Sequence, residues 1–63
     1  MINVDRLKRE MDGQGLTPAK LAKKAGLSRS FIYHILAGTR RRLNTESILK
    51  LAEALDVPVN LLF

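Results

Sequence analysis

The sequence predicts an all-α fold of five short helices, and two observations predict it. Four segments share one pattern, in which an apolar residue precedes a small polar residue and a second apolar residue follows five positions after the first; the small polar residues are Asn3, Thr17, Ser28 and Asn44. Such a side chain accepts a hydrogen bond from a free N–H at a helix start, while the apolar pair packs together. No segment alternates between apolar and polar residues as a β-strand does.

The first two helices are expected at about 3–12 and about 18–24. Gly13 and Gly26 are expected to end them, because glycine readily adopts the left-handed conformation of a helix C-cap. Pro18 stands at the first position of the second helix, where its missing N–H costs nothing.

The other three helices are expected at about 29–37, 45–55 and 59–62, with Gly38 ending the third. The fifth has a weaker start, because Pro58 stands where the others have a capping side chain. Apolar residues fall on one face of each helix and predict a single core. Its expected members are Val4, Leu7, Met11, Leu21, Ala22, Ala25, Ile32, Ile35, Leu36, Ile48, Leu49, Leu51, Ala52, Leu55, Leu61 and Leu62.

The composition narrows the possible classes of function. A chain of 63 residues is expected to form one domain, over 1–63. It contains no cysteine and one histidine, so we expect no disulfide, no metal site and no cofactor. No apolar run approaches the roughly 20 residues that span a bilayer, and the first residues lack the features of a signal peptide. We therefore expect a cytoplasmic protein with no membrane partner.

Charge is unevenly distributed along the chain. The net charge is +5, and the segment from Gly13 to Thr45 holds no acidic residue but these basic ones: Lys20, Lys23, Lys24, Arg29, Arg40, Arg41 and Arg42. A segment of one sign suggests a surface that faces a polyanion. A solvated face without a partner would have the same composition, and for Lys23 and Lys24 that alternative is equally good.

The second and third helices are joined by a very short link, Ala25-Gly26-Leu27. So short a link forces two helices to meet at a steep angle, which is helix-turn-helix geometry. Ala22 is small enough for the helices to cross closely, and Gly26 permits the positive φ of the turn. Ile32 and Ile35 are expected to hold the third helix on the core.

From 16 to 32 the chain reads LTPAKLAKKAGLSRSFI, which resembles the helix-turn-helix of the Cro/phage-repressor (Xre-type) family. LKLAEALDV, over 49–57, resembles that family's fourth helix and the turn after it. The resemblance covers nearly the whole chain and implies a compact, lambda-repressor-like domain of five helices. It also implies a bacterial or phage-encoded, nucleoid-associated transcriptional repressor that binds a palindromic operator in double-stranded DNA as a weak homodimer. Val57, Val59 and Phe63 are candidates for the dimer contact.

Three features depart from the family pattern. Pro18 replaces a glutamine that commonly holds a phosphate, which leaves Thr17 and the free amides of Ala19 and Lys20 for that contact. Met11 and Leu36 stand where the family often pairs Arg with Glu, and an apolar pair in place of a buried ion pair should preserve the fold. The loop over 39–44 is slightly longer than usual and carries three consecutive arginines.

Candidate base-reading residues lie on the third helix, where Ser30 and His34 face away from Ile32 and Ile35, Arg29 stands at the first turn and Phe31 flanks this face. A recognition helix presents its N-terminal residues to base edges in the major groove, and the candidates are Arg29, Ser30, His34 and Phe31. Arginine can grip guanine O6 and N7, and an aromatic ring can contact a thymine methyl. Two alternatives stay open: His34 as an ordinary surface histidine, and Phe31 as a residue packed at the edge of the core.

Candidate phosphate contacts lie mainly at the starts of the second and third helices and in the arginine loop. Free N–H groups and the helix dipole favour an anion at a helix start, and side chains with O–H or N–H groups add to this. The candidates are Thr17, Lys20, Ser28, Tyr33, Arg40, Arg41 and Arg42.

An enzyme is not expected, because the basic segment contains no carboxylate to act as a base and the chain has no glycine-rich phosphate loop. No small-molecule substrate is therefore expected. Two alternatives to a repressor remain: a protein-binding adaptor of the same fold, and an antitoxin that binds both DNA and a protein. A charged rather than apolar third helix favours DNA over the adaptor.

Overall fold

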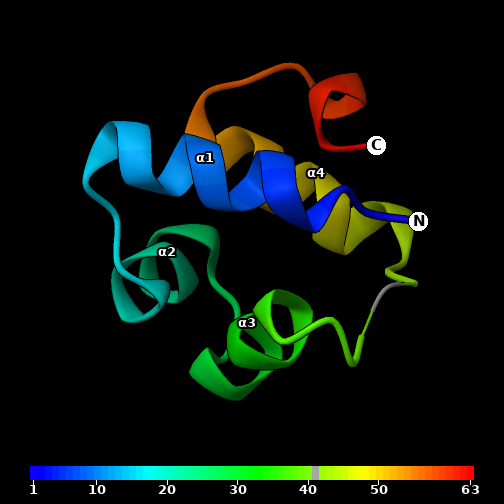
Figure 1. Cartoon of the computed structure of the whole chain (residues 1–63), viewed down its shortest axis with the longest axis horizontal. Coiled ribbons are helices and arrows are strands. Elements are labelled where there is room, and N and C mark those ends of the chain that lie inside the picture. Colours follow the sequence, from blue (N-terminus) through cyan, green and yellow to red (C-terminus); the bar gives the residue numbers. More distant parts are fainter. Residues whose placement is uncertain (41) are drawn as a thin grey trace.

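A computed structural model describes residues 1–40 and 42–63 of the chain. Its order of elements is α1 (Val4–Gln14), α2 (Pro18–Ala25), α3 (Arg29–Leu36), α4 (Thr45–Leu55) and η1 (Val59–Leu62). Helices α2 and α3 pack against each other, α4 packs against α2 and also contacts α1, and the two chain ends lie on the same side of the molecule (Figure 1). A hydrogen bond of 2.7 Å from the Asn3 N–H to the Leu62 carbonyl joins these ends. The predicted all-α fold is confirmed.

All four predicted N-caps are present. Asn3, Thr17, Ser28 and Asn44 each have extended backbone and accept a hydrogen bond from the N–H three residues ahead. The distances from donor nitrogen to side-chain oxygen run from 2.8 Å at Asn44 to 3.2 Å at Thr17. Each bond satisfies one of the backbone donors that a helix start leaves without an intrahelical partner.

The predicted end of the first helix is wrong, because α1 runs through Gly13 and is capped by Gly15 at φ 65°. The Leu16 N–H donates to the Met11 carbonyl at 2.9 Å, which closes a Schellman motif. Such a motif places an apolar residue directly after the left-handed one, and Leu16 follows Gly15 whereas Gln14 follows Gly13. The same closure ends α2 at Gly26, as predicted.

Two further helix ends differ from a simple glycine stop. Asp56 caps α4 in a left-handed conformation at φ 56°, and Val57 closes the motif through its N–H to the Ala52 carbonyl at 3.0 Å. The fifth helix, η1, is a single 3₁₀ turn rather than an α-helix. Pro58 precedes it and supplies no side-chain cap, in line with its weak start signal.

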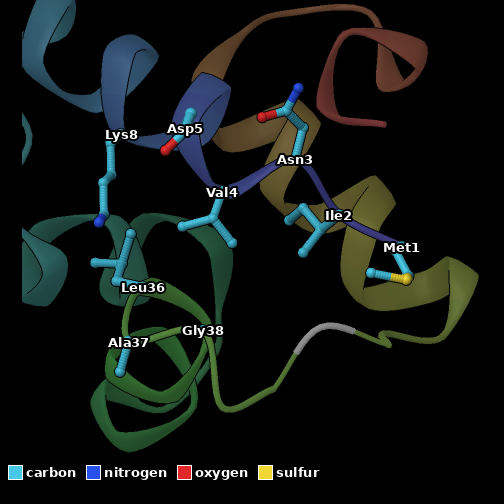
Figure 2. Close-up of a pocket in the computed structure, with 9 residues that line it drawn as sticks. All are labelled: Met1, Ile2, Asn3, Val4, Asp5, Lys8, Leu36, Ala37 and Gly38. Carbon is cyan, nitrogen blue, oxygen red and sulfur yellow. The ribbon is translucent and has the colours of Figure 1, made fainter.

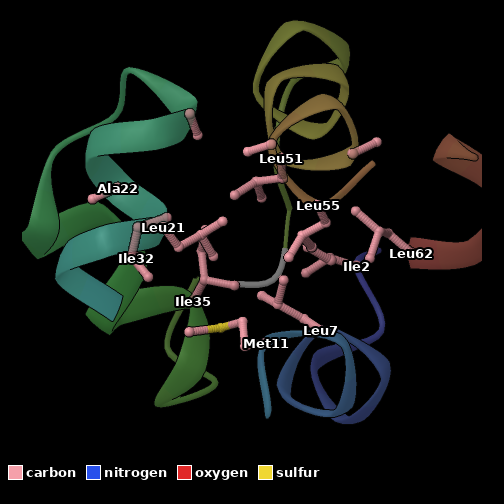
Figure 3. Close-up of a cluster of buried hydrophobic side chains, with 13 residues drawn as sticks. Ile2, Leu7, Met11, Leu21, Ala22, Ile32, Ile35, Leu51, Leu55 and Leu62 are labelled. Atoms are coloured by element: carbon pink, nitrogen blue, oxygen red, sulfur yellow. The ribbon is translucent and has the colours of Figure 1, made fainter. Parts of the chain in front are cut away.

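A single apolar core lies between the helices (Figure 3). Its largest fully buried side chains are Leu7, Leu21, Ile32, Ile35, Leu51, Leu55 and Leu62. Each such side chain contributes about 1.5–3 kcal/mol when it leaves water, so the core carries most of the stability of the fold. The prediction that Leu49 belongs to this core is wrong, since its side chain is 46% exposed on α4.

Helix α3 is held against the rest of the molecule by its apolar side. Ile32 and Ile35 are both 0% exposed and point toward the other helices (Figure 3). Ala22 of α2 is buried as well, and Gly26 adopts the positive φ of 72° that the turn between α2 and α3 requires. The opposite side of α3 therefore faces solvent.

Candidate nucleic-acid interface

The solvent side of α3 carries the residues predicted to read bases. Arg29, Ser30 and His34 are exposed on this helix, together with Tyr33. Ser30 and His34 lie on the side opposite Ile32 and Ile35, and Arg29 lies at the first turn, so the helix can approach a groove without uncovering the core. The predicted exposure of these residues is confirmed, while their contacts with DNA stay predictions.

The start of α3 offers donors to an anion. Ser28 Oγ accepts from the Phe31 N–H at 3.1 Å, which leaves the hydroxyl hydrogen available to a further acceptor. The structure shows no hydrogen bond within 1–40 and 42–63 for the N–H groups of Arg29 and Ser30. Two amides, one hydroxyl and the positive end of the helix dipole thus meet at one point, a common arrangement for binding phosphate.

The start of α2 offers fewer donors than predicted. Thr17 Oγ1 accepts from the Lys20 N–H at 3.2 Å, so the expectation that this amide is free is wrong. The cause is the capping role of Thr17 itself, which uses the N–H three residues ahead. The amide of Ala19, the hydroxyl hydrogen of Thr17 and the exposed side chain of Lys20 remain for a phosphate.

Phe31 has two contacts at the edge of the interface. Its half-buried ring packs against the core cluster, which was one of the two alternatives for this residue. The Arg40 guanidinium lies over the same ring, 4.8 Å from the ring centroid, as a cation–π contact. This contact was not predicted, because it depends on how the chain folds back after α3. It holds one arginine of the loop beside the recognition helix.

The other end of α3 is tied to the residues that follow it. Gly38 has a φ of 78°, and beyond it Thr39 lies next to His34. Thr39 Oγ1 donates to the His34 carbonyl at 3.0 Å and lies 3.3 Å from His34 Nδ1. Thr39 thereby orients the His34 imidazole, which would rotate freely if no side chain contacted it. The spacing of residues in the sequence did not indicate this contact.

Within residues 1–40 and 42–63, no salt bridge neutralises a cation of the basic segment. In the described part of the chain the one salt bridge joins Lys50 Nζ to Glu46 Oε1 at 3.5 Å, on α4. Arg40 and Arg42 are exposed, and the predicted phosphate contact of Arg41 lies outside the described residues. Unpaired cations beside α3 favour a polyanion over an acidic side chain of the same molecule.

Other hollows of the surface lie away from this interface. One separates the N-terminal segment from the end of α3 and is lined by Ile2, Val4, Lys8 and Leu36 among others (Figure 2). None of the predicted DNA-contacting residues lines it. Met11 and Leu36 both line another hollow, beside Leu16, where an apolar pair was predicted in place of an ionic one. Within residues 1–40 and 42–63, no helix has the length and hydropathy of a membrane span.

Comparison with known proteins gives the same assignment of the fold. A helix-turn-helix family model matches residues 7–62, from the first turns of α1 to the end of η1. The chain is also similar to the restriction-modification controller protein C.AhdI from Aeromonas hydrophila, whose crystal structure matches with a TM-score of 0.87 and 37% sequence identity. The match covers 95% of this chain and 89% of that one. No curated protein sequence matches the chain.

Proposed function

The chain belongs to the Cro/phage-repressor helix-turn-helix family, whose members are DNA-binding transcription regulators, and we propose that it represses transcription from a palindromic operator. The observation that carries this proposal is the solvent side of α3, which is polar and basic while its other side is fully buried. A protein-binding adaptor would be expected to show apolar side chains at that position.

Sequence reading is assigned to α3. Arg29 is proposed to grip a guanine, Ser30 to permit close approach, and His34 to bond a second base edge. Phe31 lies at the margin, where a thymine methyl can reach the exposed part of its ring. The donors at the start of α3 bind a phosphate and thereby hold the helix in register.

Backbone contacts are assigned to the flanks of the helix-turn-helix. The donors at the start of α2 bind a phosphate of one DNA strand, and the hydroxyl group of Tyr33 donates a hydrogen bond to another phosphate. Arg40 and Arg42 follow the backbone or enter the minor groove next to the recognition helix. Arg40 is already held there by the Phe31 ring, so binding orders fewer rotatable bonds of this side chain.

A palindromic operator requires two copies of the chain. Successive half-sites are about 34 Å apart along DNA, whereas the molecule measures 24 × 24 × 19 Å and carries one recognition helix. We propose that the second copy docks on the hollow lined by the apolar residues Leu49, Val57 and Val59, with the carboxylates Glu53 and Asp56 also in its lining. Phe63 is exposed but does not line this hollow, whereas Leu49 does, so Leu49 joins the proposed contact and the role of Phe63 stays a prediction.

The experiment that tests the function is selection of bound sites from random duplex DNA by the purified chain. The expected result is an enriched half-site repeated with twofold symmetry. Selection of an unrepeated site would contradict the palindrome, and no enrichment at moderate ionic strength would contradict sequence-specific binding. A reporter gene placed behind the selected site then distinguishes repression from activation.

The dimer has its own test. Leu49→Glu places a charge in the proposed contact and should abolish cooperative binding to the full palindrome. Affinity for a duplex that contains a single half-site serves as the control and should not change. Equal losses on both duplexes would place Leu49 outside a dimer contact.

A second candidate is control of a restriction-modification system, which the likeness to C.AhdI favours. In that case the selected site should occur upstream of genes for an endonuclease and a methyltransferase next to the gene of this protein. If the selected site does not occur upstream of such genes, control of a restriction-modification system is contradicted, while the general role in transcription regulation stands.

A further inference from the structure

The single histidine of the chain is held by one threonine at the end of the recognition helix. Thr39 Oγ1 lies 3.0 Å from the carbonyl oxygen of His34 and 3.3 Å from its ring atom Nδ1. The backbone N–H of Thr39 donates to the same carbonyl at 3.1 Å, so the threonine is fixed by its main chain as well as by its side chain. The imidazole is therefore next to a hydroxyl whose position is determined independently of the ring.

Only one of these two neighbours can take the hydroxyl hydrogen of Thr39. A carbonyl oxygen only accepts, so two oxygens 3.0 Å apart attract each other only when that hydrogen lies between them. His34 Nδ1 can donate or accept, according to the tautomer of the ring. The hydrogen therefore belongs to the bond with the carbonyl, Oγ1 presents a lone pair to Nδ1, and Nδ1 must carry the ring hydrogen.

The opposite ring nitrogen is consequently an acceptor. A neutral imidazole has one N–H, so with Nδ1 protonated the Nε2 atom bears only a lone pair. In the major groove the amino groups of adenine and cytosine donate, whereas guanine O6 and N7 and thymine O4 accept. An exposed Nε2 lone pair on α3 thus attracts the amino groups of adenine and cytosine and repels the acceptor atoms of guanine and thymine.

We propose that Thr39 is a positioning residue that fixes the Nδ1–H tautomer of His34, and that His34 thereby selects adenine or cytosine on the strand that it faces. The proposal rests on the proposed function, in which this side of α3 enters the major groove. It assigns a specificity-determining role to a residue that need not touch DNA.

The tautomer is measured directly by long-range ¹H–¹⁵N correlation spectra of the free protein at about pH 8.5, well above the ordinary pKa of an imidazole. Because the chain has one histidine, the ring signals need no assignment by mutation. The spectrum should show a protonated Nδ1 and a bare Nε2. Thr39→Val keeps the branched shape and should lose this pattern, Thr39→Ser should restore it, and Thr45→Val, at an exposed threonine of α4, should leave it unchanged. A protonated Nε2 in the unaltered protein would overturn the proposal.

Base preference is measured by repeating the duplex selection with Thr39→Val and Thr39→Ser. At one operator position the unaltered chain should prefer adenine or cytosine, and Thr39→Val should reduce that preference about fivefold, the order of one hydrogen bond. Thr39→Ser should retain it. If the unaltered chain selects a site but Thr39→Val selects the same bases, the role of Thr39 is wrong while DNA binding stands. If the chain selects no site although the spectrum shows Nδ1–H, the proposed function is wrong. The proposed base preference of His34 is then wrong as well, while the tautomer assignment stands.

Discussion

Two glycines near the end of α1 have opposite conformational requirements although they are two residues apart. Gly13 lies inside the helix, and Gly15 caps it at φ 65°. A Cβ atom built on either would meet nothing within 4 Å, so backbone conformation alone decides what a substitution does. Alanine is favoured over glycine in a helix and disfavoured at positive φ.

We therefore expect Gly13→Ala to stabilise the fold by about 0.5–1 kcal/mol and Gly15→Ala to destabilise it by about 1 kcal/mol. The measurement is the free energy of unfolding in urea for both variants, and each serves as the other's control. A change of the same sign in both variants would mean that α1 ends elsewhere.

Arg29 is the residue on which sequence specificity should depend most. Its side chain is exposed at the first turn of α3, beside the amides proposed to hold a phosphate. Arg29→Ala should weaken binding to the selected site by about 1–3 kcal/mol and relax the preference at one base position. Competition titrations against single-base variants of the site measure both effects. An equal loss on every duplex would reassign Arg29 to the phosphate backbone.

At the scale of elements, an apolar side chain of α1 and one of α3 line the same hollow. Met11 is 4% exposed, and Leu36 is half-buried beside the same hollow. In members of the family that have arginine and glutamate at these places, the two charges can compensate each other, so the two positions should be coupled.

Met11→Arg alone should cost about 3 kcal/mol or more, because it buries a charge without a partner. Adding Leu36→Glu should recover part of this loss, with a coupling free energy of about 0.5–3 kcal/mol. Met11→Leu is the matched control and should cost less than about 1.5 kcal/mol. Chemical denaturation of the unaltered chain, Met11→Arg, Leu36→Glu and the double variant closes the double-mutant cycle. Additive effects would show that the two positions do not contact each other.

At the scale of the whole molecule, the basic segment should make DNA binding strongly dependent on salt. Each neutralised phosphate releases counterions, so the logarithm of affinity falls linearly with the logarithm of salt concentration. Arg42→Ala should weaken binding to all duplexes alike and reduce the magnitude of this slope by about one.

Lys50→Ala is the control for that slope, because Lys50 forms a salt bridge with Glu46 on α4 rather than serving the basic segment. Titrations of both variants at several salt concentrations measure the two slopes. An unchanged slope for Arg42→Ala would place this side chain away from the phosphates.

Helix starts were predictable from the sequence because they depend on local chemistry. A capping side chain bonds an N–H three residues ahead, so the sequence around Asn3 or Ser28 contains both partners. The end of α1 was missed because two glycines offered a stop, and the choice depended on which of them is followed by an apolar residue. Attention to Leu16 after Gly15 would have found it.

The composition of the candidate site was equally predictable, but its internal contacts were not. A periodicity of 3.6 residues places Ser30 and His34 opposite the buried isoleucines, with Arg29 at the first turn of the helix. The contacts of Phe31 with Arg40 and of His34 with Thr39 depend on the path of the chain after Gly38. That path follows from backbone angles in a loop, for which the sequence has no periodic signal.

The sequence by itself determined the helices, their starts, the side of α3 that faces solvent and the basic character of that side, because each follows from neighbours within one or two helical turns. Only the tertiary structure decided that Leu49 lies outside the core and that Thr39 holds His34. The physical reason is that burial and the direction of a hydrogen bond depend on how several elements or a loop close around a residue, whereas a cap or a helical face depends on one segment alone.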